Sequence, residues 1–306
     1  MRCSNCTICV ALALLAACSS AEEATQADIP AEIQAQNSAW SEPVNLGSLV
    51  NSPFVDFTPE ISQDGLTLYF GSDRPGSLSP APDLWVSHRQ SPNSPWETPL
   101  NLGEVVNSPA ADAAPDLSRD GHYLYFSSSR DGSQGQQDVW VSYRRDVHDD
   151  FAWSAPVNLG RAVNSEAFDA GPSILGDELY FTSNRETGDA LDVYRSLKRG
   201  ESFLPAELVP ELSSEGNDLR PSIRQDGKEI LISTDRAGSF AGSQDIWSAT
   251  RQGRAQPWAT PENLGAPINT AATEQQPALS DDGRTLFFAS DRDGGSGDLD
   301  IWMTTR

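Results

Sequence analysis

Five copies of one motif follow one another along the sequence, and this repetition constrains the fold more than any other feature. Each copy begins at an aromatic residue: Trp40, Trp96, Trp153, Phe203 and Trp258. Successive copies start 50 to 57 residues apart. A repeat of this length cannot bury its own apolar face and must pack against its neighbours. Because the copies fill residues 40–306, we expect this range to form one domain.

Each copy predicts four short antiparallel strands. In the second copy, a short run at 115–118 leads into an Arg-Asp-Gly turn at 119–121, and the alternating aromatic segment 123–128 follows. A Gly- and Ser-rich loop precedes the strand at 138–143, and a last strand is expected over roughly 153–159. Four antiparallel strands repeated radially describe the blades of a β-propeller. We therefore predict an all-β fold with five four-stranded blades.

The two ends of the repeat array predict how the ring closes. The fifth copy stops after the segment 300–305, which corresponds to the third strand of a blade. The first copy starts at 40–46, which corresponds to a fourth strand without its blade. Pairing the two segments would complete the last blade and leave no free sheet edge between them.

Three signatures recur in the copies: a Pro-x-Leu/Ile-Ser-x-Asp-Gly-x-x-Leu-Tyr-Phe core, a following Ser-x-Arg, and an Asp-Ile/Val-Trp pair. With these signatures the unit resembles the WD40-like PD40 repeat of the TolB propeller, over about nine-tenths of the chain. Similar units with an Asn-Leu-Gly-x-x-Val-Asn lead-in occur in bacterial envelope proteins attached to peptidoglycan-binding domains. The resemblance implies the fold but no particular activity. TolB has six blades and an N-terminal domain, so its role is not implied here.

The first eighteen residues contain all four cysteines, at Cys3, Cys6, Cys9 and Cys18. The first three have a spacing that a metal site could use, but the segment has the layout of an export signal. Arg2 precedes an apolar stretch at 7–17 that is too short for a permanent membrane span. The Leu-Ala-Ala-Cys sequence ending at Cys18 resembles the bacterial lipobox. This resemblance implies a signal peptide at 1–17 and a lipid on Cys18.

Residues 18–39 are rich in Ala, Glu, Gln and Ser without an apolar period, and are expected to form a flexible tether. By resemblance to Gram-negative lipoproteins, Ser19 after the cysteine implies passage to the outer membrane, facing the periplasm. The net charge of −23 argues against a nucleic-acid partner and against adsorption to anionic lipid. Membrane contact is therefore expected through the lipid alone.

Charged residues recur at fixed places in every copy. The loop entering the innermost strand carries an acid, at Asp56, Asp112, Asp169, Asp218 and Glu274. The loop after the second strand begins with an arginine, at Arg74, Arg130, Arg185, Arg236 and Arg292. A group present in every blade usually holds the blade, because a catalytic group is needed only once. We therefore predict structural ion pairs, and keep a charged ring that binds a ligand or cation as the alternative.

Function is expected where the repeat departs from its own pattern. The residue after the innermost-strand proline is an acid in two copies, Glu60 and Asp116, and a small residue elsewhere. The fourth copy carries Arg220 just before its proline. Together with Asp56 and Asp112, these residues could bind a cation or a sugar, and the four acids could cleave a glycosidic bond. Drift among solvent-facing positions would explain the same departures.

Other chemistries lack a motif in this sequence. There is no Gly-x-Ser-x-Gly elbow and no phosphate loop, and the three histidines form no metal-binding spacing. The segment 291–294 resembles a calcium loop without its full set of ligands, so no cofactor is expected and calcium is the one candidate. The first hypothesis is a non-enzymatic scaffold that binds a protein or glycan of the cell envelope. The alternative is a glycan-active hydrolase or lyase.

Overall fold

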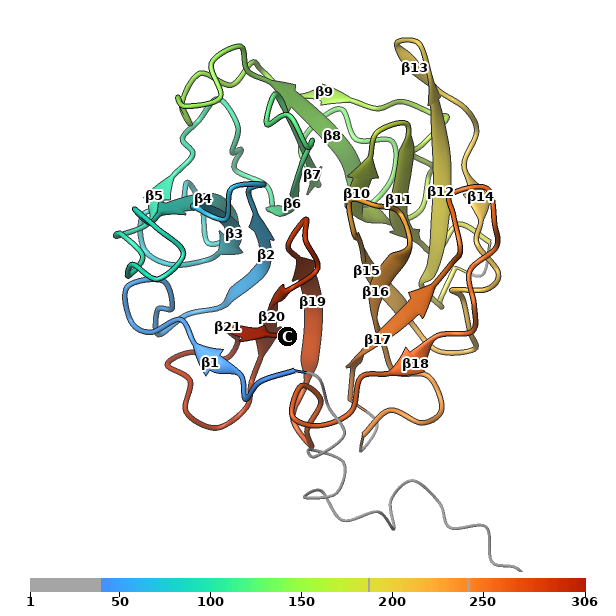
Figure 1. Ribbon diagram of the computed structural model, residues 1–306. Coiled ribbons are helices and arrows are strands. Elements are labelled where there is room, and N and C mark those ends of the chain that lie inside the picture. The colour runs from blue at the N-terminus through green and yellow to red at the C-terminus, as the bar shows by residue number, and fades with distance from the viewer. Residues whose placement is uncertain (1–39, 187, 241–242) are drawn as a thin grey trace, which may run out of the picture.

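The computed structural model describes residues 40–186, 188–240 and 243–306. The expected signal peptide, Cys18 and the tether lie outside these residues. Every regular element in the described ranges is a β-strand, and the strands form five sheets arranged around a common axis (Figure 1). The predicted five-bladed propeller is therefore confirmed. Among the described residues there is no helix long and apolar enough to cross a membrane.

Each of the first two blades is one antiparallel sheet whose strands follow chain order from the axis outward. Blade one contains β2 (Asp56–Ile61), β3 (Thr67–Ser72), β4 (Asp83–His88) and β5 (Leu100–Asn101). Blade two contains β6 (Asp112–Leu117), β7 (Tyr123–Ser128), β8 (Asp138–Tyr143) and β9 (Val157–Asn158).

The remaining three blades repeat this order, except that blade three has one additional strand and blade five takes its outermost strand from the other end of the described chain. Blade three contains β10 (Asp169–Leu175), β11 (Glu178–Ser183), β12 (Asp192–Arg199) and β14 (Glu207–Leu208), with the added β13 (Ser202–Phe203). Blade four contains β15 (Asp218–Ile223), β16 (Glu229–Thr234), β17 (Asp245–Thr250) and β18 (Glu262–Asn263). Blade five contains β19 (Glu274–Leu279), β20 (Thr285–Ser290), β21 (Asp300–Thr305) and β1 (Val44–Asn45) from the other end of the described chain.

The outermost strands are shorter than the sequence suggested. The last strand of blade two was expected over 153–159, but only Val157–Asn158 pair with β8. Pro156 precedes this pair and has no N–H to donate, so the regular ladder is interrupted there. Beyond the proline, the Ser154 N–H still donates to the Tyr143 carbonyl of β8 at 2.7 Å. Blade three differs again, because β12 runs on into a hairpin with β13 in which Lys198 faces Phe203.

The ring closes as predicted. Val44 pairs with Met303, and Asn45 pairs with Trp302, so β1 is the outermost strand of blade five (Figure 1). The side chain of Asn51 strengthens this junction, because it accepts a hydrogen bond from the Ile301 N–H (2.8 Å) and donates one to the Ile301 carbonyl (3.0 Å).

A backbone kink in the middle of each innermost strand shapes the channel. One residue per blade has φ between 48° and 62°: Thr58, Ala114, Gly171, Arg220 and Gln276. This conformation is costly for residues other than glycine, and it interrupts the strand register at this point. The N–H of each kinked residue instead donates to a side chain of the preceding blade, for example from Arg220 to Thr182 Oγ1 at 2.9 Å. The kink therefore fixes one residue of every blade at the channel.

Candidate functional site

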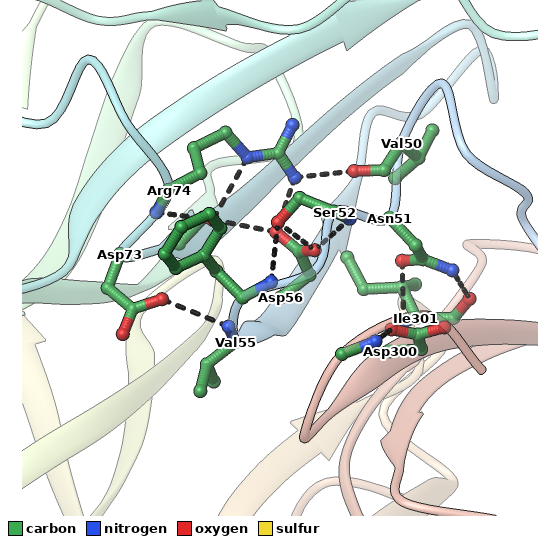
Figure 2. Close-up of polar contacts among 12 residues, drawn as sticks. Val50, Asn51, Ser52, Val55, Asp56, Asp73, Arg74, Asp300 and Ile301 are labelled. Atoms are coloured by element: carbon green, nitrogen blue, oxygen red, sulfur yellow. Dashed lines mark hydrogen bonds and ion pairs between the residues drawn. The ribbon is translucent and has the colours of Figure 1, made fainter.

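The acid and arginine rings are structural ion pairs. Asp56 is fully buried and accepts hydrogen bonds from Ser52, Ser72 and Arg74 (Figure 2). Arg74 also donates to the Val50 carbonyl, so it fastens the loop that enters the innermost strand. The other four blades contain the equivalent pairs: Asp112–Arg130, Asp169–Arg185, Asp218–Arg236 and Glu274–Arg292. The predicted ion pairs are thus present in all five blades.

Because of these pairs, the structure does not group Asp56 and Asp112 with the other proposed site residues. Both carboxylates are fully buried, and each has both oxygens engaged by a serine and an arginine of its own blade. Neither aspartate lines the two cavities that contain Glu60 and Arg220.

Glu60, Asp116 and Arg220 do come together. They lie on three different innermost strands, β2, β6 and β15, and are close enough to shift one another's pKa. Burial raises the pKa of Asp116 to about 7, against the opposing effects of the Ile174 N–H and Arg220. Burial, followed by the charge of Asp116, raises the pKa of Glu60 well above its usual value. Burial lowers the pKa of Arg220 to about 10, so Arg220 remains a cation at neutral pH.

The two acids also connect neighbouring blades. Glu60 Oε1 accepts from the Leu117 N–H at 3.4 Å, and Asp116 Oδ1 accepts from the Ile174 N–H at 2.9 Å. The next two blade junctions use the hydroxyls of Ser173 and Ser222 in the same way. The acids therefore replace serine at an acceptor position, and each uses one oxygen for this contact.

Arg220 differs from the acids because its guanidinium has no partner. Within the described part of the chain it makes no ion pair or hydrogen bond, and its Nη1 is buried. Space for the side chain comes from blade three, which has Gly171 at the equivalent position. A Cβ placed on Gly171 would lie 2.7 Å from Arg220 Cδ.

Arg220 lines a cavity of about 310 Å³ at one mouth of the channel. This mouth is formed by the loops that enter the innermost strands and by the residues before the third strands. Partly exposed rings and amides surround the arginine, contributed by Phe57, Phe168, Gln137, Gln275 and Gln276. The lining described by the structure contains no carboxylate.

Glu60 lines a different cavity at the opposite mouth, of about 340 Å³. The turns between first and second strands form this mouth. Its wall includes His88, whose Nε2 lies 2.7 Å from Asp150 Oδ2, and Arg144, whose Nη1 lies 2.7 Å from Asp150 Oδ1. Buried Tyr69 also donates to Asp150. No sequence pattern pointed to this cluster, because Asp150 lies in a loop that is longer than the corresponding loops before Trp96 and Trp258.

The described residues contain no group of three or more His, Cys, Asp or Glu side chains that could hold a metal ion. In the segment that resembles a calcium loop, Asp291 accepts from the Thr273 N–H at 2.7 Å, and Arg292 pairs with Glu274. These side chains are engaged in contacts of their own blade.

The sequence matches no family model and no curated protein. Solved structures do share the fold. The endo-arabinase from Bacteroides thetaiotaomicron has a TM-score of 0.57 at 16% identity, over 87% of this chain and 97% of that chain. The catalytic domain of an alpha-L-arabinofuranosidase from Coprinopsis cinerea has a TM-score of 0.54 at 14% identity, over 88% and 96%. TolB from Acinetobacter baumannii has a TM-score of 0.49 at 16% identity, over 84% of this chain and 55% of that one. At these identities the likeness concerns the fold alone.

Proposed function

We propose that the protein binds a glycan, without cleaving it, in the cavity that contains Arg220. The observation that carries this proposal is the lining of the cavity, in which partly exposed phenylalanine rings stand beside amide side chains. Aromatic faces pack against the apolar face of a sugar, and amides supply hydrogen bonds to its hydroxyls. Two solved structures that share the fold are an endo-arabinase and an alpha-L-arabinofuranosidase. A glycan is therefore the favoured ligand class for a propeller of this kind.

The size of the cavity favours a glycan over a protein surface. A stable protein interface buries about 800 Å² per partner, whereas small-molecule sites occupy roughly 300–1,000 Å³. A volume of about 310 Å³ lies at the lower end of that range and suits one or two sugar rings. The absence of carboxylates from the described lining favours binding over cleavage, since glycosidases need a pair of carboxyl groups beside the bond.

We also propose where the protein works. The PD40-like repeat and the lipobox-like segment ending at Cys18 together favour a lipoprotein of the bacterial envelope. In this proposal the lipid on Cys18 holds the propeller at the outer membrane, and residues 18–39 let it reach glycans in the periplasm.

Binding is tested by calorimetry with the purified protein and a panel of plant and envelope oligosaccharides. Phe168→Ala should weaken binding of any ligand found by about tenfold, because a lost ring contact costs roughly 1.4 kcal/mol. Phe151→Ala is the matched control, since this ring is 56% exposed and lies outside the cavity. If no member of the panel binds, or if both variants bind like the wild type, the proposed site is wrong.

Glycan cleavage is the second candidate, and the pair Glu60 and Asp116 favours it. A carboxyl group with a pKa of about 7 can donate a proton to a leaving group near neutral pH. The same panel is assayed for new reducing ends and for unsaturated products. Turnover by the wild type that Glu60→Gln or Asp116→Asn abolishes would establish a hydrolase or lyase and overturn binding without cleavage.

A further inference from the structure

Among the described residues, the guanidinium of Arg220 makes no hydrogen bond or ion pair, in a place where the fold does not require a cation. The equivalent positions of the other blades hold Thr58, Ala114, Gly171 and Gln276. All five residues share the positive φ of the kink, so the backbone does not call for an arginine. A buried guanidinium nitrogen without a hydrogen-bond partner has a desolvation cost. This cost is offset if a ligand supplies the missing partner.

We infer that Arg220 recognises a carboxylate on the ligand, so that the glycan which enters this cavity carries a uronic acid. This inference rests on the proposed function, because it names the class of glycan that the same cavity takes. Guanidinium groups pair with carboxylates through two parallel hydrogen bonds, which fixes both position and orientation.

The nearby acids do not serve as this partner. Neither Glu60 nor Asp116 forms an ion pair with Arg220 within the described residues, and each gives an oxygen to the backbone of the next blade. Glu60 faces the opposite mouth of the channel. Both acids lie close enough to favour the charged form of Arg220, but neither accepts a hydrogen bond from its guanidinium. The hydrogen-bond donors of Arg220 are therefore available to a ligand in the cavity.

The lining supports an acidic sugar rather than a simple anion. A small inorganic anion has no apolar surface to bury, whereas this cavity places its one arginine beside phenylalanine rings and alanines as well as amides and hydroxyls. A uronic acid combines a carboxylate with an apolar ring face and with hydroxyl groups. The small volume suits a terminal sugar or a short branch.

Gly171 allows the inference to be tested without changing the arginine. An alanine at this position would push its Cβ to 2.7 Å from Arg220 Cδ and displace the guanidinium. Ala114 has φ of 59° at the same place in blade two, so the backbone accommodates alanine in this conformation. The Gly171→Ala variant should therefore fold, with the guanidinium of Arg220 displaced from its position in the cavity.

The experiment measures the affinity of the purified protein for digalacturonate and trigalacturonate, for the neutral galactose di- and trisaccharides, and for a sulfated disaccharide. The wild type should bind the galacturonates at least tenfold more tightly than the neutral sugars. Arg220→Met and Gly171→Ala should reduce galacturonate binding to the level of the neutral sugars. Arg161→Met is the control, because it removes the same charge from an exposed site outside the cavity.

Three outcomes would overturn the inference. The wild type binds neutral sugars as tightly as galacturonates; the sulfated sugar binds more tightly than the galacturonates; or Arg220→Met keeps the acidic preference. In each case glycan binding itself survives, because sugars still enter the cavity. If none of the acidic, neutral or sulfated sugars binds, the proposed function fails and the inference fails with it. Thermal unfolding of each variant shows whether a lost preference reflects a lost fold.

Discussion

Asn51 provides the sharpest test of how the ring is closed. Its side chain bonds both backbone groups of Ile301, 250 residues away (Figure 2). It also donates to Asn45 Oδ1 at 2.9 Å. Asn51→Ala removes all three hydrogen bonds at the junction between β1 and β21. Ile301 is fully buried, so its N–H would be left without a partner in a region without access to bulk water, whereas its carbonyl keeps the hydrogen bond from the Leu46 N–H at 3.1 Å.

The expected loss of stability follows from the N–H of Ile301. A buried polar group left without its partner costs about 1–3 kcal/mol, so Asn51→Ala should lose about 1–3 kcal/mol of stability. In a domain of this size, each kcal/mol lowers the unfolding midpoint by roughly 2–4 °C. Asn51→Ala should therefore lower the midpoint by about 2–12 °C.

Asn107→Ala is the matched control for this measurement. Asn107 bonds the N–H of Leu84 (2.8 Å) and its carbonyl (3.0 Å) in the same geometry, but the two residues are 23 positions apart. Both variants are unfolded by heat and by urea, and limited proteolysis then reports cleavage near residues 44–50. If the junction is closed as described, Asn51→Ala loses at least as much stability as Asn107→Ala and becomes sensitive to cleavage there. An unchanged midpoint for Asn51→Ala beside a lowered one for Asn107→Ala would refute this account of closure.

Three further changes test other features. Asp116→Asn keeps an acceptor for the Ile174 N–H but cannot ionise. In the folded wild type the pKa of Asp116 is raised to about 7, so the wild type loses stability on the order of 4 kcal/mol as pH rises from about 4 to 7. Urea unfolding of the variant should therefore show a smaller dependence on pH. Ala278→Ser should raise the unfolding free energy by about 1 kcal/mol, since it offers the Ile61 N–H the side-chain oxygen that Ala278 lacks. Cys18→Ser should release the protein from membranes on fractionation; continued sedimentation with membranes would contradict the proposed anchor.

The fold could be predicted because its signals are local and repeated. A Ser-x-Asp-Gly turn, an alternating aromatic strand and an Asp-Trp strand define most of a blade, and five copies define the ring. Recurrence also identified the ion pairs such as Asp56–Arg74. The regular part of the outermost strands is shorter than expected, and Pro156 marks where the ladder with β8 is interrupted.

The candidate site was predictable only in part. Departures from the repeat pointed to Glu60, Asp116 and Arg220, which the structure brings together. Ser173 and Ser222 occupy the position of these acids in other copies, and serine and acids both supply an acceptor oxygen. The repeat itself therefore indicated that the acids accept a backbone hydrogen bond. The unpartnered state of Arg220 depends on side chains from several blades, so no pattern within one copy could reveal it.

The offset between sequence copies and blades has a consequence for how such a chain can change. Every copy supplies the outermost strand of one blade and the inner three strands of the next. Duplication or deletion of one whole copy in the gene would therefore add or remove a blade without leaving any sheet incomplete. A new number of blades would change the angle between neighbouring innermost strands. Contacts between those strands, such as the hydrogen bond from the Ile174 N–H to Asp116, would then have to form in a different geometry. The fit of the innermost strands around the channel therefore sets the number of blades. The outer strands place no limit on that number.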